Sequence, residues 1–247
     1  MTTNSTTALI TGGTSGIGRA TANKLAQLGI HVLIVGRNVE RGDKTVAEIR
    51  AAGGRADFIS SDLRDASSAR EVARKAVELA DGHVDILINN AGIFPFGPTN
   101  KTTEEEFDRV YSLNVKVPYF LVAELAPLMA GRGKGAIVNV STMVSDYGVS
   151  GMSLYGSSKA AINLLTKSWA AEYGHSGVRV NAVSPGPTRT EGTDAMGEGL
   201  EQLAAQAPAG RPATADEIAE AIVFLATDRS SFVYGAKLAV DGGRAAI

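Results

Sequence analysis

The sequence predicts an α/β protein built on a doubly wound parallel sheet of about seven strands, with helices on both faces. Two patterns predict it. Short, β-rich apolar runs alternate with longer amphipathic segments over the full length of the chain. The apolar runs are also continuous rather than alternating, which is typical of strands that are covered on both faces.

Each expected element follows from a local pattern. The expected strands are the apolar runs at residues 7–11, 31–35, 56–60, 84–88, 135–141, 178–184 and 237–240. The expected helices are the segments between them, at residues 17–28, 39–52, 66–80, 103–130, 155–174 and 215–226. No linker or repeat divides the chain, so residues 1–247 are expected to form a single domain. Residues 185–213 form a Gly-, Pro- and Thr-rich insertion, which we expect to be a lid over the substrate.

Composition narrows the class of protein. The chain has 247 residues, 44% of them hydrophobic and 20% charged, and a net charge of −2, so nothing in it indicates a nucleic-acid or membrane partner. It has no cysteine, and its three histidines lack the spacing of metal ligands, so no metal site is expected. The polar N-terminus leads into the first apolar run without a signal-peptide pattern, which predicts a soluble, cytoplasmic protein.

A glycine-rich stretch, TGGTSGIG, lies between the first expected strand and the first expected helix. Gly12, Gly16 and Gly18 let the backbone turn tightly and come close to a ligand, and the amino end of the following helix offers N–H groups to an anion. This arrangement is typical of the pyrophosphate site of a Rossmann-type dinucleotide-binding fold.

Tyr155 and Lys159 lie four positions apart in an expected helix, so both project from one face within reach of each other. Tyrosine and lysine ordinarily titrate near ~10 and ~10.4, and a nearby ammonium favours the phenolate. The pair therefore predicts a general acid/base with a lowered tyrosine pKa.

Asn114 lies inside the expected helix 103–130, where asparagine is an unfavourable residue. Pro118 follows four positions later and has no N–H to donate to the Asn114 carbonyl. We therefore expect an irregular helix at this point, with that carbonyl free for another partner.

Taken together, these motifs resemble those of the short-chain dehydrogenase/reductase family, and the resemblance covers essentially the whole chain. It implies an enzyme that transfers a hydride between a nicotinamide cofactor and a carbonyl or alcohol carbon. The motifs that carry it are, in order, Thr-Gly-x-x-x-Gly-x-Gly at 11–18, Asp62–Leu63, NNAG at 89–92, Asn114, Ser141, Tyr155 with Lys159, and Pro185–Gly186 with Thr190.

The resemblance also implies roles for individual residues. The expected catalytic residues are Asn114, which holds a water that connects to the lysine, Ser141, which binds the substrate carbonyl, Tyr155, which transfers the proton, and Lys159, which also binds the nicotinamide ribose. The expected cofactor-binding residues are Gly12, Thr14, Ser15, Gly16, Ile17, Gly18, Arg37, Asp62, Leu63, Asn89, Ala91, Gly92, Tyr155, Lys159, Pro185, Gly186, Thr188 and Thr190.

The end of the second strand decides which cofactor is expected. Folds that use NAD normally place Asp or Glu there to bind the ribose 2′-hydroxyl. In this chain that position is Gly36, and Arg37 follows it. A guanidinium binds a 2′-phosphate through charge-assisted hydrogen bonds, so the sequence favours NADP(H) over NAD(H).

The expected substrate pocket is mostly apolar, which favours a neutral ketone or secondary alcohol of medium size. Three functions stay open: a reductase of ketones or 3-oxoacyl groups, a sugar or polyol dehydrogenase, and a regulator that binds NADP(H) without turnover. The complete set of catalytic residues argues against the regulator. The expected pocket residues are Phe94, Met143, Tyr147, Met152 and Met196.

Two expected helices carry apolar residues beyond one face. The family commonly pairs these helices across a two-fold axis, and its C-terminal region, here 240–243, often forms a second interface. The resemblance therefore implies a homotetramer, with a dimer as the alternative. The apolar residues concerned are Phe120, Leu121, Leu125, Leu164, Leu165 and Trp169.

Overall fold

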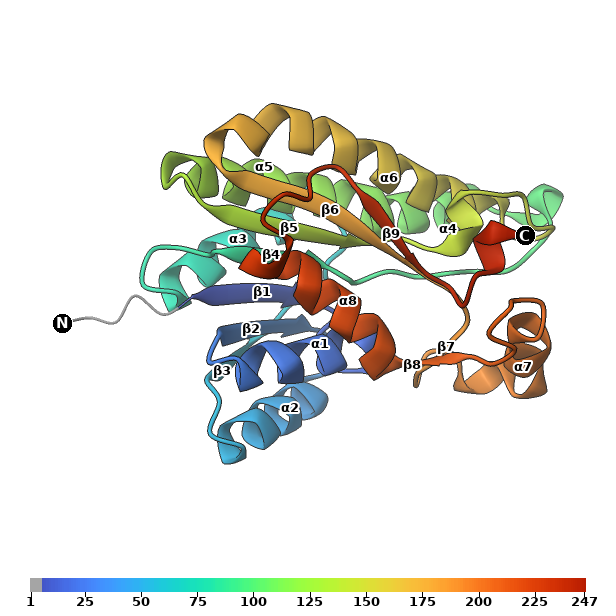
Figure 1. Ribbon diagram of the computed structural model, residues 1–247, viewed down its shortest axis with the longest axis horizontal. Coiled ribbons are helices and arrows are strands. Elements are labelled where there is room, and N and C mark those ends of the chain that lie inside the picture. The colour runs from blue at the N-terminus through green and yellow to red at the C-terminus, as the bar shows by residue number, and fades with distance from the viewer. Residues whose placement is uncertain (1–5) are drawn as a thin grey trace.

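The computed structural model describes residues 6–247, and strands from both halves of the chain share one seven-stranded sheet (Figure 1). The strand order is β3-β2-β1-β4-β5-β6-β9, and neighbouring strands pair in parallel. This confirms the predicted fold class. The strands are β1 (Thr7–Thr11), β2 (His31–Gly36), β3 (Ala56–Ser60), β4 (Ile86–Asn89), β5 (Gly135–Val140), β6 (Val178–Pro185) and β9 (Lys237–Val240).

Helices cover both faces of the sheet (Figure 1). One apolar core lies under α1, α2 and α8, and the other lies under α3, α5 and α6. The strands supply both cores, because successive side chains of a strand point to opposite faces. In β1, Leu9 belongs to one core and Ile10 to the other. The helices are α1 (Gly16–Gln27), α2 (Val39–Ala51), α3 (Ala66–Leu79), α4 (Glu104–Tyr111), α5 (Val117–Gly131), α6 (Ser153–Tyr173), α7 (Glu198–Ala204) and α8 (Ala215–Ala226).

The expected irregularity near Asn114 is present as a π-helical turn, Ser112–Lys116, between α4 and α5. The Val117 amide donates to the Ser112 carbonyl, so the hydrogen-bond ladder lengthens by one residue directly before Pro118. A proline has no N–H to continue an ordinary ladder, and π turns of this kind are frequent at functional sites.

The continuous helical stretch from Glu104 to Gly131 is long and apolar enough to cross a membrane by length and composition alone. Its apolar residues are used inside the fold, since Leu121, Leu125 and Met129 are fully buried against the sheet. We therefore assign this stretch to the core. The polar residues 1–5, on which the expectation of a cytoplasmic protein rested, lie outside the described residues.

The insertion 185–213 has regular structure of its own. It contains β7 (Thr188–Arg189), which pairs in parallel with β8 (Ala213–Thr214), and the short helix α7. In Figure 1, α7 lies at the same end of the sheet as the C-terminus.

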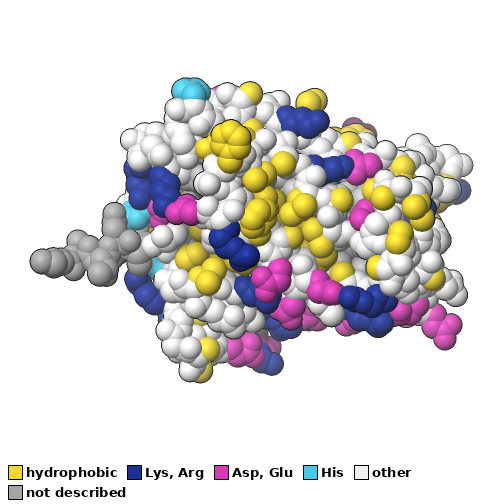
Figure 2. Space-filling view, in the orientation of Figure 1, with side chains coloured by type: hydrophobic (Ala, Val, Ile, Leu, Met, Phe, Trp, Pro, Cys, Tyr) yellow, Lys and Arg dark blue, Asp and Glu magenta, His cyan; other side chains and the backbone are white. Residues whose placement is uncertain are grey.

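The structure corrects the predicted interface residues. Leu121, Leu125 and Trp169 are buried in the core of the chain itself, because the helices that carry them pack on the sheet. Leu164, also predicted, is exposed, and among the described residues the other large apolar side chains exposed on these helices are Phe107, Tyr119 and Leu128. Figure 2 shows a further gathering of apolar side chains across the middle of the face that carries α8 and β9.

Candidate active site

The motif residues meet where the parallel strands end. The glycine-rich turn follows β1, NNAG begins at the end of β4, Ser141 and Thr142 follow β5, and Pro185 ends β6. The strand order reverses around β1 and β4, and open α/β sheets bind ligands at the carboxyl ends of strands beside such a reversal.

Lys159 reaches the end of β5 from the first turns of α6. It is buried, and its Nζ donates a hydrogen bond to the Val140 carbonyl at 2.7 Å. Burial in apolar surroundings disfavours the ammonium and lowers the pKa of Lys159 to about 8.

The pKa of Tyr155 shifts in the direction opposite to the one predicted. Burial raises the pKa of Tyr155 to about 12, and a hydrogen bond with the Thr142 side chain lowers it by less. The expected lowering by Lys159 is wrong for the chain by itself. The reason is that the Lys159 ammonium is hydrogen-bonded to the Val140 carbonyl, while the phenol loses solvation.

The hydroxyl beside Tyr155 is that of Thr142, which the sequence reasoning missed. Ser141 is buried, and its Oγ lies 3.5 Å both from the Ser145 Oγ and from the Lys159 carbonyl. Thr142 has an extended backbone, with φ −164° and ψ 154°. Successive side chains of an extended chain point in opposite directions, so only one of the two neighbours can face the phenol. The sequence does carry a sign of this alternative, because two hydroxyl residues, Ser141 and Thr142, stand side by side at the end of the strand.

Asn114 ties the π turn to both the loop after β4 and to α6. Its Oδ1 accepts from the Ile93 amide at 3.0 Å, and its Nδ2 donates to the Ile93 carbonyl at 2.9 Å and to the Ser158 Oγ at 3.1 Å. A Cβ at Gly92 would lie 3.2 Å from the Asn114 Oδ1 and 3.3 Å from the Lys159 Nζ. The structure thus brings Asn114, Lys159 and Gly92 together.

The glycine-rich turn has the shape of a dinucleotide cradle. A Cβ at Gly18 would lie 2.3 Å from the Gly12 carbonyl oxygen, and a Cβ at Gly12 would lie 2.9 Å from the Asn90 Nδ2. Larger residues therefore do not fit at either position. Helix α1 begins at Gly16, and the Ser15 side chain does not cap it. The uncapped N–H groups fit the pyrophosphate of a dinucleotide.

The NNAG segment holds the strand ends in register rather than simply lining a cavity. Asn89 donates to the Asn139 Oδ1 at 2.9 Å, which links β4 to β5. Asn90 donates to the Thr11 carbonyl at 2.9 Å and to the Gly12 carbonyl at 3.2 Å. The Ala91 amide donates to the Thr11 Oγ1 at 3.0 Å. Asn90, which lies within the expected NNAG segment, thus fixes the cradle directly.

The expected adenine end is open to solvent. Arg37 and Asp62 are exposed, with 3.8 Å between the Arg37 Nε and the Asp62 Oδ1. Leu63 next to them is buried. A Cβ at Gly36 would lie 2.7 Å from the Thr14 Cγ2, so Thr14 covers the position where a dinucleotide fold that uses NAD carries its acidic residue. Ile17, also expected at this site, packs partly into the core below.

The end of β6 leads into the lid. Thr188 is buried, and its Oγ1 donates to the Gly186 carbonyl at 2.9 Å. The amide and the hydroxyl of Thr190 both approach the Thr193 Oγ1, at 3.0 and 3.3 Å. Glu191, which the sequence reasoning also missed, accepts a hydrogen bond from the Gly16 amide at 2.8 Å.

The expected substrate-pocket residues are only partly brought together. Phe94 is exposed and its ring centroid lies 6.1 Å from that of Tyr155. Tyr147 is partly buried under the guanidinium of Arg244, which lies 5.0 Å from its ring centroid. Met152 precedes α6, Met143 is buried, and Met196 is exposed on the lid.

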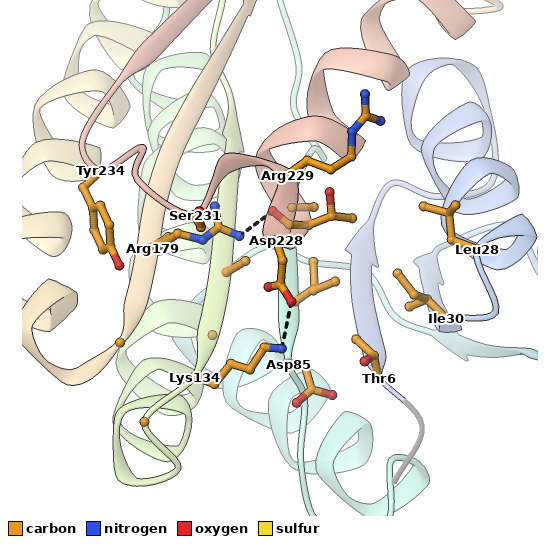
Figure 3. A pocket seen from close by; sticks show the side chains of 17 residues that line it. Thr6, Leu28, Ile30, Asp85, Lys134, Arg179, Asp228, Arg229, Ser231 and Tyr234 are labelled. Carbon is orange, nitrogen blue, oxygen red and sulfur yellow. Dashed lines mark hydrogen bonds and ion pairs between the residues drawn. The ribbon is translucent and has the colours of Figure 1, made fainter. Parts of the chain in front are cut away.

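A sizeable cavity lies at the opposite end of the sheet (Figure 3). It measures about 620 Å³ and is lined by residues that begin strands, such as Ile86, Ala136 and Arg179. None of the expected site residues lines it. In residues 6–247, no group of three His, Asp or Glu side chains could hold a metal ion.

Comparisons with known proteins match the chain almost from end to end. A family model described as Enoyl-(Acyl carrier protein) reductase matches residues 12–245. A structure described as a short chain dehydrogenase/reductase family protein superposes with a TM-score of 0.91 at 46% identity, over 98% of both chains.

Two further relatives carry more specific descriptions. A structure from Beutenbergia cavernae, described as an NAD(P)-dependent gluconate 5-dehydrogenase with bound NADP at low occupancy, superposes with a TM-score of 0.92 at 37% identity. The match covers 98% of this chain and 97% of that one. The cis-4-hydroxycyclohexanecarboxylate dehydrogenase of Sinomonas cyclohexanicum is 40% identical over 243 residues, 97% of this chain and 96% of the relative.

Proposed function

This chain belongs to the short-chain dehydrogenase/reductase family of oxidoreductases, and from that premise we propose that it is an NADP(H)-dependent enzyme that reduces a ketone or 3-oxoacyl carbonyl to a secondary alcohol. The observation that carries the proposal is the position of Lys159. Its Nζ and the Asn114 Oδ1 converge on Gly92, beside the cradle that fits a dinucleotide. All of these groups lie in what we take to be a single domain, residues 1–247, with 185–213 as its lid.

The protein's own groups bind, orient and transfer a proton. A nicotinamide held beside Tyr155 and Lys159 would supply or accept the hydride. Tyr155 donates the proton to the carbonyl oxygen in reduction and accepts it from the alcohol in oxidation. Its high pKa keeps the phenol protonated at neutral pH, which suits the general acid of the reduction direction. Lys159 and Asn114 fix the geometry of this end of α6, and so place the phenol relative to the cradle.

We propose that Thr142 carries the role that the family resemblance assigned to Ser141. The support is the hydrogen bond between the Thr142 side chain and Tyr155, whereas the Ser141 hydroxyl lies against Ser145 and the Lys159 carbonyl. In this arrangement the Thr142 hydroxyl and the phenol would both hydrogen-bond the carbonyl oxygen of the substrate.

A panel of ketones and secondary alcohols, followed by the absorbance of the reduced nicotinamide, tests the proposed reaction. We expect cofactor oxidation with at least one medium-sized ketone and the reverse reaction with its alcohol. Tight NADPH binding with no turnover across the panel would instead support a non-catalytic regulator.

The choice of NADP(H) over NAD(H) rests on Arg37 and Gly36. Arg37 is exposed and not closely paired, so it is available to a 2′-phosphate. Because a side chain at position 36 would collide with Thr14, the clean test is Arg37→Leu. Wild type should prefer NADPH in kcat/KM by roughly 10- to 150-fold, and the variant should lose most of that preference. Arg74→Leu is the control, because Arg74 is an exposed arginine of α3 that pairs with Glu78.

A second substrate class is favoured by one observation. Arg244 lies over Tyr147, an expected pocket residue, and its Nε is buried without a hydrogen-bond partner. A guanidinium at the rim of the pocket suits a hydroxy acid, such as a sugar acid, whose carboxylate it would bind. Relatives named for gluconate and for hydroxycyclohexanecarboxylate agree with this alternative. It predicts higher kcat/KM for a hydroxy acid than for its methyl ester, and loss of that difference in Arg244→Leu.

We propose a homotetramer in the cytoplasm, with a dimer as the alternative. Two separate apolar areas support it: the exposed side chains of α4, α5 and α6, and the segment before β9, where Phe232 is 97% exposed. Two areas on one subunit allow two different two-fold interfaces, which together generate a tetramer. Light scattering at micromolar concentration tests it, and a monomer would contradict both assemblies.

A further inference from the structure

A carboxylate of the lid lies on the helix terminus where the pyrophosphate of a dinucleotide is expected. The Glu191 Oε2 accepts a hydrogen bond from the Gly16 amide at 2.8 Å, and the Glu191 Oε1 pairs with the Arg19 guanidinium at 2.7 Å. Both partners belong to the start of α1, 175 and 172 positions away along the chain. The contact therefore joins the lid to the glycine-rich turn.

Helix α1 has no local substitute for this anion. The Ser15 side chain makes no capping hydrogen bond, and the first turn of the helix contains no acidic residue. Free N–H groups and the helix dipole favour a negative charge at such a terminus. Glu191 is thus the anion that the chain itself brings to this position.

The backbone around Glu191 is held in a compact turn. The Thr193 hydroxyl donates to the Thr188 carbonyl at 2.8 Å, and the Thr193 amide donates to the Thr190 carbonyl at 2.9 Å. A Cβ at Gly16 would lie 3.2 Å from the Thr190 Cβ and Cγ2. The turn therefore packs directly on the start of α1, and an incoming phosphate meets the turn as well as the carboxylate.

We propose that Glu191 is an internal competitor for the pyrophosphate of the cofactor, and that its contact with α1 keeps the lid on the empty cradle until the cofactor enters. The proposal rests on the proposed function, since it takes NADP(H) to be the ligand. A pyrophosphate carries more negative charge than one carboxylate, so it displaces Glu191 from the helix terminus and gains Arg19 as a partner. Displacement moves Thr190, an expected contact of the nicotinamide, so cofactor entry and lid movement are coupled.

The size of the effect follows from competition within one molecule. An internal competitor reduces the apparent affinity in proportion to the fraction of molecules that remain open, so the apparent Kd is the intrinsic Kd divided by that fraction. Both charged side chains are 39% exposed, and ion pairs of this exposure stabilise a contact only modestly. We therefore expect removal of the Glu191 charge to tighten NADPH binding about threefold to tenfold.

Calorimetric titration of NADPH into wild type, Glu191→Gln and Glu191→Ala tests the proposal. Both variants should bind more tightly than wild type, with Glu191→Ala at least as tight as Glu191→Gln, because glutamine keeps a neutral acceptor for the Gly16 amide. Glu201→Gln is the matched control, because Glu201 is a lid carboxylate that pairs with Arg189 and does not touch α1. Unchanged or weaker binding by the Glu191 variants, or equal tightening in Glu201→Gln, would overturn the proposal.

Inorganic pyrophosphate separates this proposal from the proposed function. Its affinity should rise in Glu191→Ala, and hydrogen exchange of lid amides 188–196 should be faster in Glu191→Ala than in wild type. If wild type binds pyrophosphate but not NADPH, the proposed cofactor is wrong. The role of Glu191 is then tested by the pyrophosphate affinities of wild type and Glu191→Ala alone. Equal pyrophosphate affinity and equal lid exchange in the two proteins would overturn the role of Glu191.

Discussion

At the amino end of the sheet, the Arg179 guanidinium donates to the carbonyls of Leu225 and Thr227 and to the Ser230 Oγ, at distances of 2.7 to 3.0 Å. At the carboxyl end of the same sheet, the Lys159 ammonium donates to a single carbonyl, that of Val140. Both cations are buried, and burial lowers the pKa of both. Arg179 thus joins three acceptors of the fold, whereas the three N–H donors of Lys159 meet one.

The same contrast holds for the polar groups around these two residues. Beside Arg179, the cavity shown in Figure 3 is lined by charges that pair with one another, including Lys134 with Asp228 at 3.2 Å. The buried side-chain atoms without a hydrogen-bond partner in residues 6–247 gather on the other side. They are the Asn89 Oδ1, Asn163 Oδ1, Ser184 Oγ and Arg244 Nε.

These atoms belong to strand ends, to the C-terminal segment, or to a side chain that bonds the loop after β5. Buried polar groups without a partner inside the protein are found where a ligand, an ordered water or a reaction uses them. Cavity volume therefore does not identify the active site in this protein. The charged side chains around the large cavity pair with one another, whereas the carboxyl end keeps buried polar atoms without a partner.

The largest expected effect is the loss of turnover in Tyr155→Phe. Only the hydroxyl is removed, so NADPH binding should be kept while kcat falls by 10²- to 10⁴-fold, the range for a general acid. Steady-state kinetics with an accepted ketone and calorimetric NADPH binding measure the two quantities. Retention of more than about a tenth of the wild-type rate would show that another group is the main proton donor.

Arg179→Met should damage the fold instead of the chemistry. It leaves two carbonyls and a hydroxyl without their donor in a buried site, which we expect to lower the free energy of unfolding by about 2 to 4 kcal/mol. At a temperature where the variant is folded, kcat should equal that of wild type. The control is Arg229→Met, an exposed residue lining the same cavity. A fall in kcat without a loss of stability would contradict the assignment of Arg179 to the fold rather than to catalysis.

Lys159 should make the stability depend on pH with a definite sign. Its pKa falls from 10.5 to about 8 on folding, so between these values the unfolded chain holds a proton that the folded chain has lost. Stability then rises with pH across this window. Relative to Lys159→Met, the wild-type free energy of unfolding should rise by up to about 3 kcal/mol.

Urea unfolding from pH ~7.5 to ~10.5 measures this difference, and Tyr155 is common to both proteins, so its own titration cancels. Lys167→Met removes an exposed lysine from the same helix and is the control. A difference between wild type and Lys159→Met that stays constant over this range would show that Lys159 is not held in a desolvated site.

The smallest expected effect on kcat comes from replacing Thr142 or Ser141, and it tests which of the two hydroxyls binds the substrate carbonyl. Thr142→Ala should lower kcat by about 100-fold, the lower end of the range for one hydrogen-bond donor to a reacting oxygen. Thr142→Ser keeps the hydroxyl and should restore most of the rate. Ser141→Ala should change kcat by less than about threefold, since its hydroxyl points elsewhere. The reverse ranking of the two alanine variants would return the role to Ser141.

The sequence by itself determined the layout of the chain. Strand and helix positions follow from patterns that repeat within a few residues, because the pleat and the helical turn are local geometry. The order of the glycine-rich turn, NNAG, Asn114, Tyr155 and Lys159 also placed the expected site at the carboxyl ends of the strands. Even the irregular helix at Asn114 was predictable, since Pro118 lacks the N–H that an ordinary ladder requires.

Tertiary structure decided how those residues are used. Successive residues of an extended chain point to opposite sides, so either Ser141 or Thr142 faces Tyr155, but not both. The local sequence pattern does not decide which of the two it is. The titration of Tyr155 and Lys159 depends on burial by segments distant in sequence, which outweighs their proximity on one helix face. The contact between Glu191 and Gly16 spans 175 positions, so it exists only once the lid has folded back onto the first helix.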